Sequence, residues 1–200
     1  YDPSKIKAGT ANGAEGALTA DESDAPRIEG ELNISLSALS EGSNLAISGM
    51  YQEAENAGEV EAKGIHVGGT LVGGPAALTA HYYNGECLGI TLQMDVSATS
   101  SNGVCRDADG YYVQGTYNYG AGKVGVSWGG SYQDKAGNDG ASKDVKEEQE
   151  MWTLGIYHNL APEWLAVAEY SRAEEDWYDK EAVDERGESD IFSVGMFYLW

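Results

Sequence analysis

Positive charge is scarce in this chain. Among its 200 residues, 12 Lys and Arg stand against 33 Asp and Glu, for a formal net charge of −21. A nucleic-acid phosphate backbone must be met by clustered Lys and Arg, so this balance excludes nucleic acid as a partner. Cations are the expected binding partners. Two interpretations of the acidity stay open: a solvated surface, or a role in cation preference.

Long apolar runs and catalytic motifs are also missing. No stretch approaches the roughly 18 consecutive apolar residues of a membrane-spanning helix, which excludes a helical membrane protein. No nucleophile elbow, phosphate loop, HExxH or Cys-x-x-Cys motif occurs, so we predict no enzyme, no cofactor and no metal site. The histidines, His66, His81 and His158, are scattered, and we expect wall or interface residues. His66 and His81 share a predicted hairpin, which leaves a chance cation site as the lesser alternative.

Cysteine is limited to Cys87 and Cys105, which bracket a polar segment containing glycine. An even pair around a loop in an exported chain predicts a disulfide, with two free thiols as the alternative. The chain begins at Tyr1 without an initiator Met, which predicts either a removed leader or a fragment.

The abundant residues are glycine and the interfacial aromatics: 27 Gly, 13 Tyr and 5 Trp against 2 Phe. They occur in segments where apolar and polar residues alternate, as in a strand with one apolar face. In the clearest segment, 123–133, a large apolar row opposes small polar residues. The alternation predicts strands at 27–39, 44–53, 63–73, 76–85, 110–119, 123–133, 150–160, 164–172 and 192–200.

The final segment has one wholly apolar face and ends on Trp200. The closing strand of a membrane barrel has this composition, because neighbouring strands seal both of its edges and its last aromatic lies in the interfacial girdle. We therefore predict an all-β fold, a transmembrane antiparallel up-and-down β-barrel, with residues 1–200 as a single domain. A soluble secreted all-β protein is the alternative.

Short and long connections alternate along the chain. Turns at 40–43, 73–75, 120–122 and 161–163 predict one rim, and loops at 11–25, 54–62, 87–109, 134–149 and 173–189 predict the external rim. This parity makes 87–109 one long loop, although 88–96 alternates like a strand. We expect that loop to fold back and narrow the lumen, with Cys87 and Cys105 at its base. We expect residues 1–25 to form an N-terminal segment and external loop and residues 26–200 to form the barrel strands, and a tenth strand at 5–10 stays open.

Pore-facing charge is the chemistry that these strands predict, because a charge on the lipid face costs on the order of 2–4 kcal/mol. The expected pore-lining residues are Glu29, Glu31, Gln114, Lys123 and Glu169, and the expected constriction-loop carboxylates are Asp95 and Asp107. The expected aromatic girdle is Trp128, Tyr132, Trp152, Trp164, Tyr170, Tyr198 and Trp200. A ring of carboxylates favours cations, whereas in a wide lumen the same groups would only hydrate the wall. The acidic run at 174–188 has two further interpretations, a solvated loop or a collector of divalent cations at the rim.

Five segments together carry a family resemblance: APRIEGEL at 25–32, AHYYNGE at 80–86, DGYYVQGTY at 109–117, LGIYHNL at 154–160 and VAEYSR at 167–172. In order and spacing they resemble the C-terminal half of a Gram-negative outer-membrane general-diffusion porin of roughly sixteen strands. The resemblance implies a water-filled outer-membrane channel for small hydrophilic solutes, usually a homotrimer, in contact with the lipid bilayer and lipopolysaccharide. It also implies a constriction where an inward-folded loop faces wall charges.

The chain departs from that family in length and in arginine content. It has about half the family's length, which leaves open a fragment, one piece of a split barrel, or a shortened ten-strand relative. It also lacks an evident basic ladder, so we do not expect anion preference. We predict a passive, cation-preferring diffusion channel. The alternatives are a plugged, non-channel barrel with a structural or adhesive role and, ranked last, a barrel enzyme.

Overall fold

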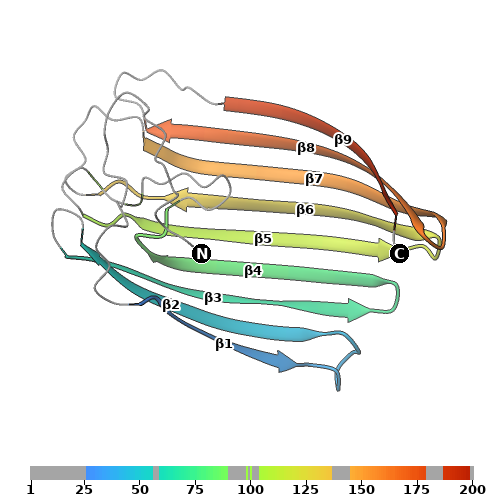
Figure 1. Cartoon of the computed structure of the whole chain (residues 1–200), viewed down its shortest axis with the longest axis horizontal. Helices are drawn as coiled ribbons and strands as arrows, with labels where there is room; N and C mark the ends of the chain where they lie inside the picture. Colours follow the sequence, from blue (N-terminus) through green and yellow to red (C-terminus); the bar gives the residue numbers. More distant parts are fainter. Residues whose placement is uncertain are drawn as a thin grey trace.

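A single antiparallel sheet accounts for most of the described chain. The computed structural model describes residues 26–55, 59–89, 104–136, 145–178 and 187–198, together with Ala98 and Ser100. Nine strands lie in the sheet in the order in which they follow one another in the chain (Figure 1). They are β1 Ile28–Ser35, β2 Asn44–Glu55, β3 Glu59–Gly73, β4 Ala76–Glu86, β5 Asp107–Asn118, β6 Gly122–Gln133, β7 Val145–Ala161, β8 Trp164–Tyr178 and β9 Gly187–Tyr198. This arrangement confirms the predicted all-β, up-and-down architecture.

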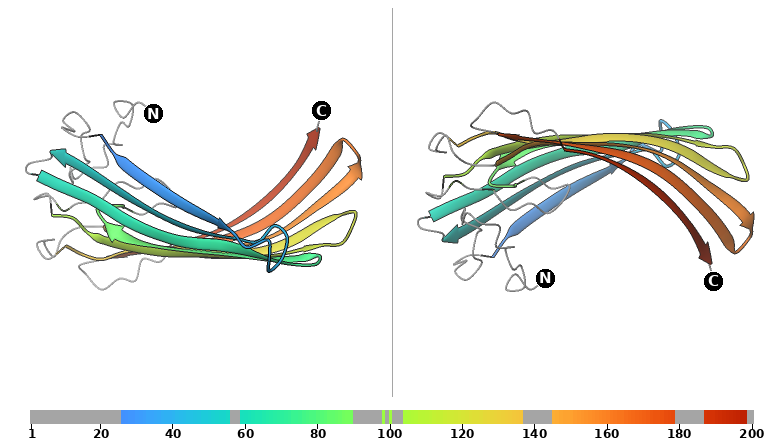
Figure 2. Two further views of the ribbon diagram at one scale, coloured as in Figure 1. Left: turned by 90° about the horizontal axis from the view of Figure 1, so that it is seen from below. Right: turned by 90° about the horizontal axis from the view of Figure 1, so that it is seen from above.

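The sheet is strongly curved, and no second layer formed by described residues packs on it (Figure 2). β1 and β9 are its two edges and do not pair with each other in the described part of the chain. The described chain is therefore a partial barrel wall. The described residues include no helix that is long and apolar enough to cross a membrane.

Four short connections, β1–β2, β3–β4, β5–β6 and β7–β8, lie at the same rim, on the right of Figure 1. Three of them contain a glycine with positive φ, Gly42 at +83°, Gly74 at +60° and Gly120 at +92°, a region that other residues adopt only at a cost. In the β7–β8 connection, Pro162 lies outside both strands and removes no ladder hydrogen bond. We call this the turn rim, and the opposite edge the loop rim.

At the loop rim the predicted boundaries were wrong, because the strands are longer than the alternation indicates. Glu55 pairs with Glu59, Val145 pairs with Tyr178, and Glu175 pairs with Gly187. Residues 54–55, 59–62, 145–149, 173–178 and 187–189 of the predicted loops at 54–62, 134–149 and 173–189 are therefore strand. The physical reason is that both faces of a strand meet water beyond the bilayer, so backbone hydrogen bonds continue where hydrophobic alternation stops.

Burial is inverted relative to a soluble protein. The largest fully buried side chains are Arg106, Gln133, Ser43 and Ser100, whereas Val194 is 73% exposed and Ile65 is 70% exposed. A soluble fold hides its large apolar groups. This sheet presents them outward, and in water they would form an exposed apolar surface far larger than a monomer tolerates.

Candidate functional site: the polar face of the curved sheet

Strand register sorts the side chains into two faces, because directly paired residues point the same way. One row across five strands runs Leu71, Leu78, Gly115, Val126 and Leu154. The adjacent row, one position along each strand, runs Thr70, Thr79, Gln114, Ser127 and Thr153. We call these the apolar face and the polar face. Along β4 the apolar-face positions are exposed and the polar-face positions are partly covered, so the polar face is the concave one.

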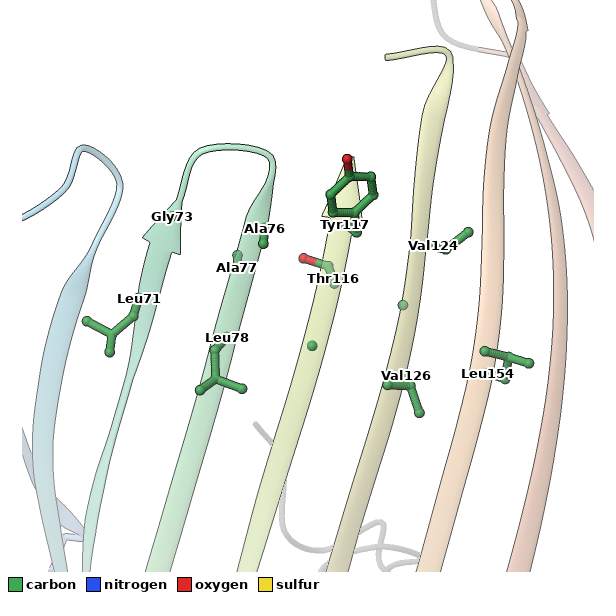
Figure 3. A pocket seen from close by; sticks show the side chains of 12 residues that line it. Leu71, Gly73, Ala76, Ala77, Leu78, Thr116, Tyr117, Val124, Val126 and Leu154 are labelled. Atoms are coloured by element: carbon green, nitrogen blue, oxygen red, sulfur yellow. The ribbon is translucent and has the colours of Figure 1, made fainter. Parts of the chain in front are cut away.

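The apolar face has a shallow groove near the turn rim (Figure 3). Leu71, Leu78, Val126 and Leu154 project from four strands there, and Gly115 leaves a gap in their row, since a Cβ at that position would meet nothing within 4 Å. No charged side chain lines the groove. An apolar surface of this kind suits acyl chains better than a hydrophilic solute.

The expected girdle aromatics share the apolar face wherever the structure describes them. Trp128 pairs directly with Trp152, and Trp164 pairs with Tyr198 at the turn rim. Tyr132 follows Trp128 on the same face of β6 and donates a 2.5 Å hydrogen bond to Glu150, while the Tyr170 ring lies 5.2 Å from that of Trp152. Trp200 lies outside the described residues.

All five of the expected pore-lining residues fall on the polar face. Glu31 pairs with Ser48, Gln114 pairs with Ser127, and Glu169 pairs with Gly155 and Ser193. Glu29 lies two positions before Glu31 on β1 and forms an ion pair with Arg27. The remaining one, Lys123, pairs with Tyr157.

Tyr157 links two of these residues and was not singled out from the sequence. The Lys123 ammonium nitrogen lies 4.9 Å from the centre of the Tyr157 ring, and the Tyr157 hydroxyl donates a hydrogen bond to Oε1 of Glu169. The cation, the ring and the carboxylate form one group across β6, β7 and β8. The signal in the sequence was the position of Tyr157 among the polar, not the apolar, residues of its strand.

The connection after β4 begins by turning onto the polar face. Cys87 and Cys105 form a disulfide, as predicted. The Leu88 side chain lies over two glycines of that face, since a Cβ on Gly85 or Gly64 would come within 2.7 Å or 2.9 Å of a Leu88 methyl carbon. Glycine at these positions lets the start of the loop pack against the wall.

The returning end of this connection is held by backbone hydrogen bonds. Cys87 N–H donates to the Arg106 carbonyl at 3.0 Å, and Arg106 N–H donates to the Ala98 carbonyl at 3.0 Å. Arg106, with 1% of its surface exposed, is buried along with Gln133 and Gln149 near the loop rim. Buried polar side chains therefore lie at this end of the sheet.

The two expected constriction carboxylates are not brought together. Asp95 lies outside the described residues. Asp107 was expected in a loop ending at 109, but it is the first residue of β5 and pairs with Glu86, which places it on the same face of the sheet as the apolar row. The loop is shorter than predicted because β4 and β5 pair as far as this acidic pair, above the apolar band.

A second polar-face group, absent from the expected pore residues, is the His66 and His81 pair. His66 Nε2 lies 2.9 Å from His81 Nδ1. His158 is elsewhere, on the apolar face, with its Nδ1 2.9 Å from the Tyr119 hydroxyl. Among the described residues, no group of three or more His, Cys, Asp or Glu side chains is placed to hold a metal ion.

Comparison with known proteins identifies a family for the chain. The family model described as Gram-negative porin matches residues 4–177. No curated protein matches the chain in sequence.

Two solved structures share the fold. One is the outer membrane channel DcaP of Acinetobacter baumannii, with a TM-score of 0.75, 14% identity, and coverage of 88% of this chain and 52% of that one. The other is an anion-selective porin from Comamonas acidovorans, with a TM-score of 0.63, 13% identity, and coverage of 92% and 53%. The chain thus spans about half the length of the solved structures it resembles.

Proposed function

Since the chain belongs to the Gram-negative porin family, we propose that its polar face lines a water-filled channel through which small hydrophilic solutes diffuse passively. Members of this family lie in the outer membrane, and that is the location of this protein. The observation that carries the proposal is the paired rows: large apolar groups on the convex side and small polar groups, with their hydroxyls hydrogen-bonded, on the concave side. Thr70 and Thr79 hydroxyls lie 2.9 Å apart, and those of Thr153 and Ser171 lie 2.8 Å apart.

The same wall supports a preference for cations. Glu29, Glu31, Glu169 and Glu175 occupy polar-face positions on β1 and β8, and Lys123 occupies a polar-face position on β6. A wall with excess carboxylates attracts cations and repels anions. One structure of similar fold is named an anion-selective porin, and at 13% identity the fold is shared while the wall charges are free to differ.

The constriction belongs to the connection between β4 and β5. Its disulfide closes the base, and Leu88 holds its first residues against Gly64 and Gly85 on the polar face. A loop anchored on the concave side narrows the lumen. Arg106, buried at its returning end, sets a basic group near this constriction.

Assembly and lipid contacts follow from the same proposal. The edges at β1 and β9 carry backbone groups that need partner strands in a bilayer, because hydrocarbon cannot accept their hydrogen bonds. A barrel of about twice this strand number supplies partner strands for both edges. Assembled as a homotrimer in lipid and lipopolysaccharide, it covers the apolar face. Its subunit number is measurable as the mass of the detergent-solubilised complex.

Planar-bilayer recording tests the function. The protein purified from outer membranes is expected to add stepwise conductance, with a reversal potential in a KCl gradient that corresponds to a K⁺ preference. A bilayer that stays closed contradicts the channel and favours a plugged barrel. Conductance with a Cl⁻ preference contradicts only the assignment of the wall charges.

A further inference from the structure

His66 on β3 and His81 on β4 lie ring to ring on the polar face. His66 Nε2 is 2.9 Å from His81 Nδ1, the ring centroids are 5.1 Å apart, and the ring planes differ by 13°. The Ser48 hydroxyl lies 3.2 Å from the other nitrogen of His66, Nδ1. Both rings are partly exposed on the concave side, so a solute in the lumen can reach them.

A glycine makes this approach possible. Gly68 is the direct cross-strand partner of His81, and a Cβ at Gly68 would lie 2.0 Å from His81 Nδ1. The His81 ring therefore occupies the space that a side chain at position 68 would take, and it reaches His66 from there. Any larger residue would push the ring away without touching the backbone pairing.

The nitrogen separation is that of two ligands on one metal ion. Imidazole nitrogens bind divalent transition metals at about 2.0–2.1 Å, so two of them at a right angle lie about 2.9 Å apart. In the metal-free pair, one N–H lies between the two nitrogens. The ion binds beside the line that joins the two nitrogens, because the midpoint of that line is too close to both of them. The proton between the nitrogens moves through water to Nε2 of His81, so both rings stay neutral. With the ion on Nε2, His66 carries its proton on Nδ1 and donates it to the Ser48 hydroxyl, which holds the ring in this orientation.

We propose that His66 and His81 form a two-imidazole site for a borderline divalent metal ion, Cu²⁺ before Ni²⁺ or Zn²⁺, with water completing its coordination. The order follows the general affinities of nitrogen ligands. With two protein ligands, the site exchanges its ion readily, unlike a closed structural centre. Mg²⁺ and Ca²⁺ prefer oxygen and are expected on the carboxylates instead.

Copper electron paramagnetic resonance tests the site on the protein purified in detergent, with excess Mg²⁺ present to occupy the carboxylates. The expected result is one Cu²⁺ whose spectrum shows coupling to two nitrogens. His66→Asn or His81→Asn should weaken Cu²⁺ binding about tenfold or more. Gly68→Ala, which keeps both imidazoles and displaces one, should also weaken it, whereas His158→Asn should leave it unchanged.

Equal Cu²⁺ binding by the wild type and the His66→Asn/His81→Asn double variant would overturn the proposal, and so would a spectrum with oxygen ligands alone. Folding of each variant is checked by the heat-dependent gel mobility typical of intact barrels. Because this readout needs no ion current, it stands even if the proposed channel function fails.

The location of the metal site inside the pore rests on the proposed function, and single-channel current tests it separately. Cu²⁺ should reduce the single-channel current of the wild type and leave that of the double variant unchanged. Cu²⁺ bound at the two histidines with no change in a conducting channel would place the ion outside the permeation path. A bilayer that is closed with and without Cu²⁺ would reject the channel and not the metal site.

Discussion

The hydroxyl of Tyr157 on β7 donates a hydrogen bond to the carboxylate of Glu169 on β8, and the same ring carries the Lys123 ammonium on its face. A cation over an aromatic face is attracted by the ring's negative potential. Tyr157 thus holds two opposite charges at fixed places on the concave wall. Removal of Lys123 makes the net charge of that wall more negative, and removal of Glu169 makes it less negative.

Wall charge is expected to control ion preference. Glu169→Gln should lower the K⁺ to Cl⁻ permeability ratio, and Lys123→Gln should raise it, each by about twofold, because one of several wall charges is lost in a solvated lumen. Reversal potentials in a KCl gradient measure both. Glu148→Gln removes the same charge from the other face of the sheet, and a shift as large as that of Glu169→Gln would contradict the assignment of faces.

Reduction of the disulfide should loosen the loop and leave the wall intact. Cys87 and Cys105 are 18 residues apart, and closing a loop of this length is worth about 3 kcal/mol in the chain-entropy model. The Cys87→Ser/Cys105→Ser variant should therefore lose up to about 3 kcal/mol of unfolding free energy in urea. Its current should be larger and noisier, because Leu88 is no longer held against Gly64 and Gly85. A current identical to that of the oxidised wild type would remove the loop from the constriction.

Neighbouring positions on β6 should differ in how much a charge destabilises the barrel. Val126→Lys places an ammonium on the apolar face and should cost about 2–4 kcal/mol near the middle of the bilayer. Ser127→Lys places the same group on the polar face and should cost less than about 0.5 kcal/mol. Urea titration in phospholipid vesicles measures both. Equal costs would mean that the two faces do not differ in environment.

Glycines on the apolar face should differ in their tolerance of a methyl group. A Cβ on Gly69 would lie 2.3 Å from the Asn44 carbonyl oxygen, whereas one on Gly115 would meet nothing within 4 Å. Gly69→Ala should therefore destabilise the barrel by about 1–3 kcal/mol, because backbone must move. Gly115→Ala should stay within about 0.5 kcal/mol of wild type, and similar unfolding midpoints for the two variants would contradict the strand register.

Within the membrane band, the sequence alone was enough to place residues on faces. Val124, Val126 and Trp128 alternate with Lys123, Ser127 and other polar residues, and the structure has them on opposite faces as predicted. Hydrocarbon on one side and water on the other require apolar and polar residues to alternate along each strand. The pattern therefore depends only on neighbouring positions in the sequence. The turns predicted at 73–75, 120–122 and 161–163 were equally readable, because glycine and proline mark them. The strand predicted at 27–39 was too long, since β1 ends at Ser35 and the connection to β2 begins at residue 36.

Sequence alone determined the class of fold, the strand order, the disulfide and the two faces, since each depends on local alternation, turn residues or an obvious pair. Only the tertiary structure decided the strand ends at the loop rim, the place of Asp107 in β5, and the groups formed by Lys123 with Tyr157 and Glu169 and by His66 with His81. Those features depend on register between strands and on the space that a glycine leaves beside a ring. Both are properties of neighbouring chains in contact, and a pattern of period two does not contain them.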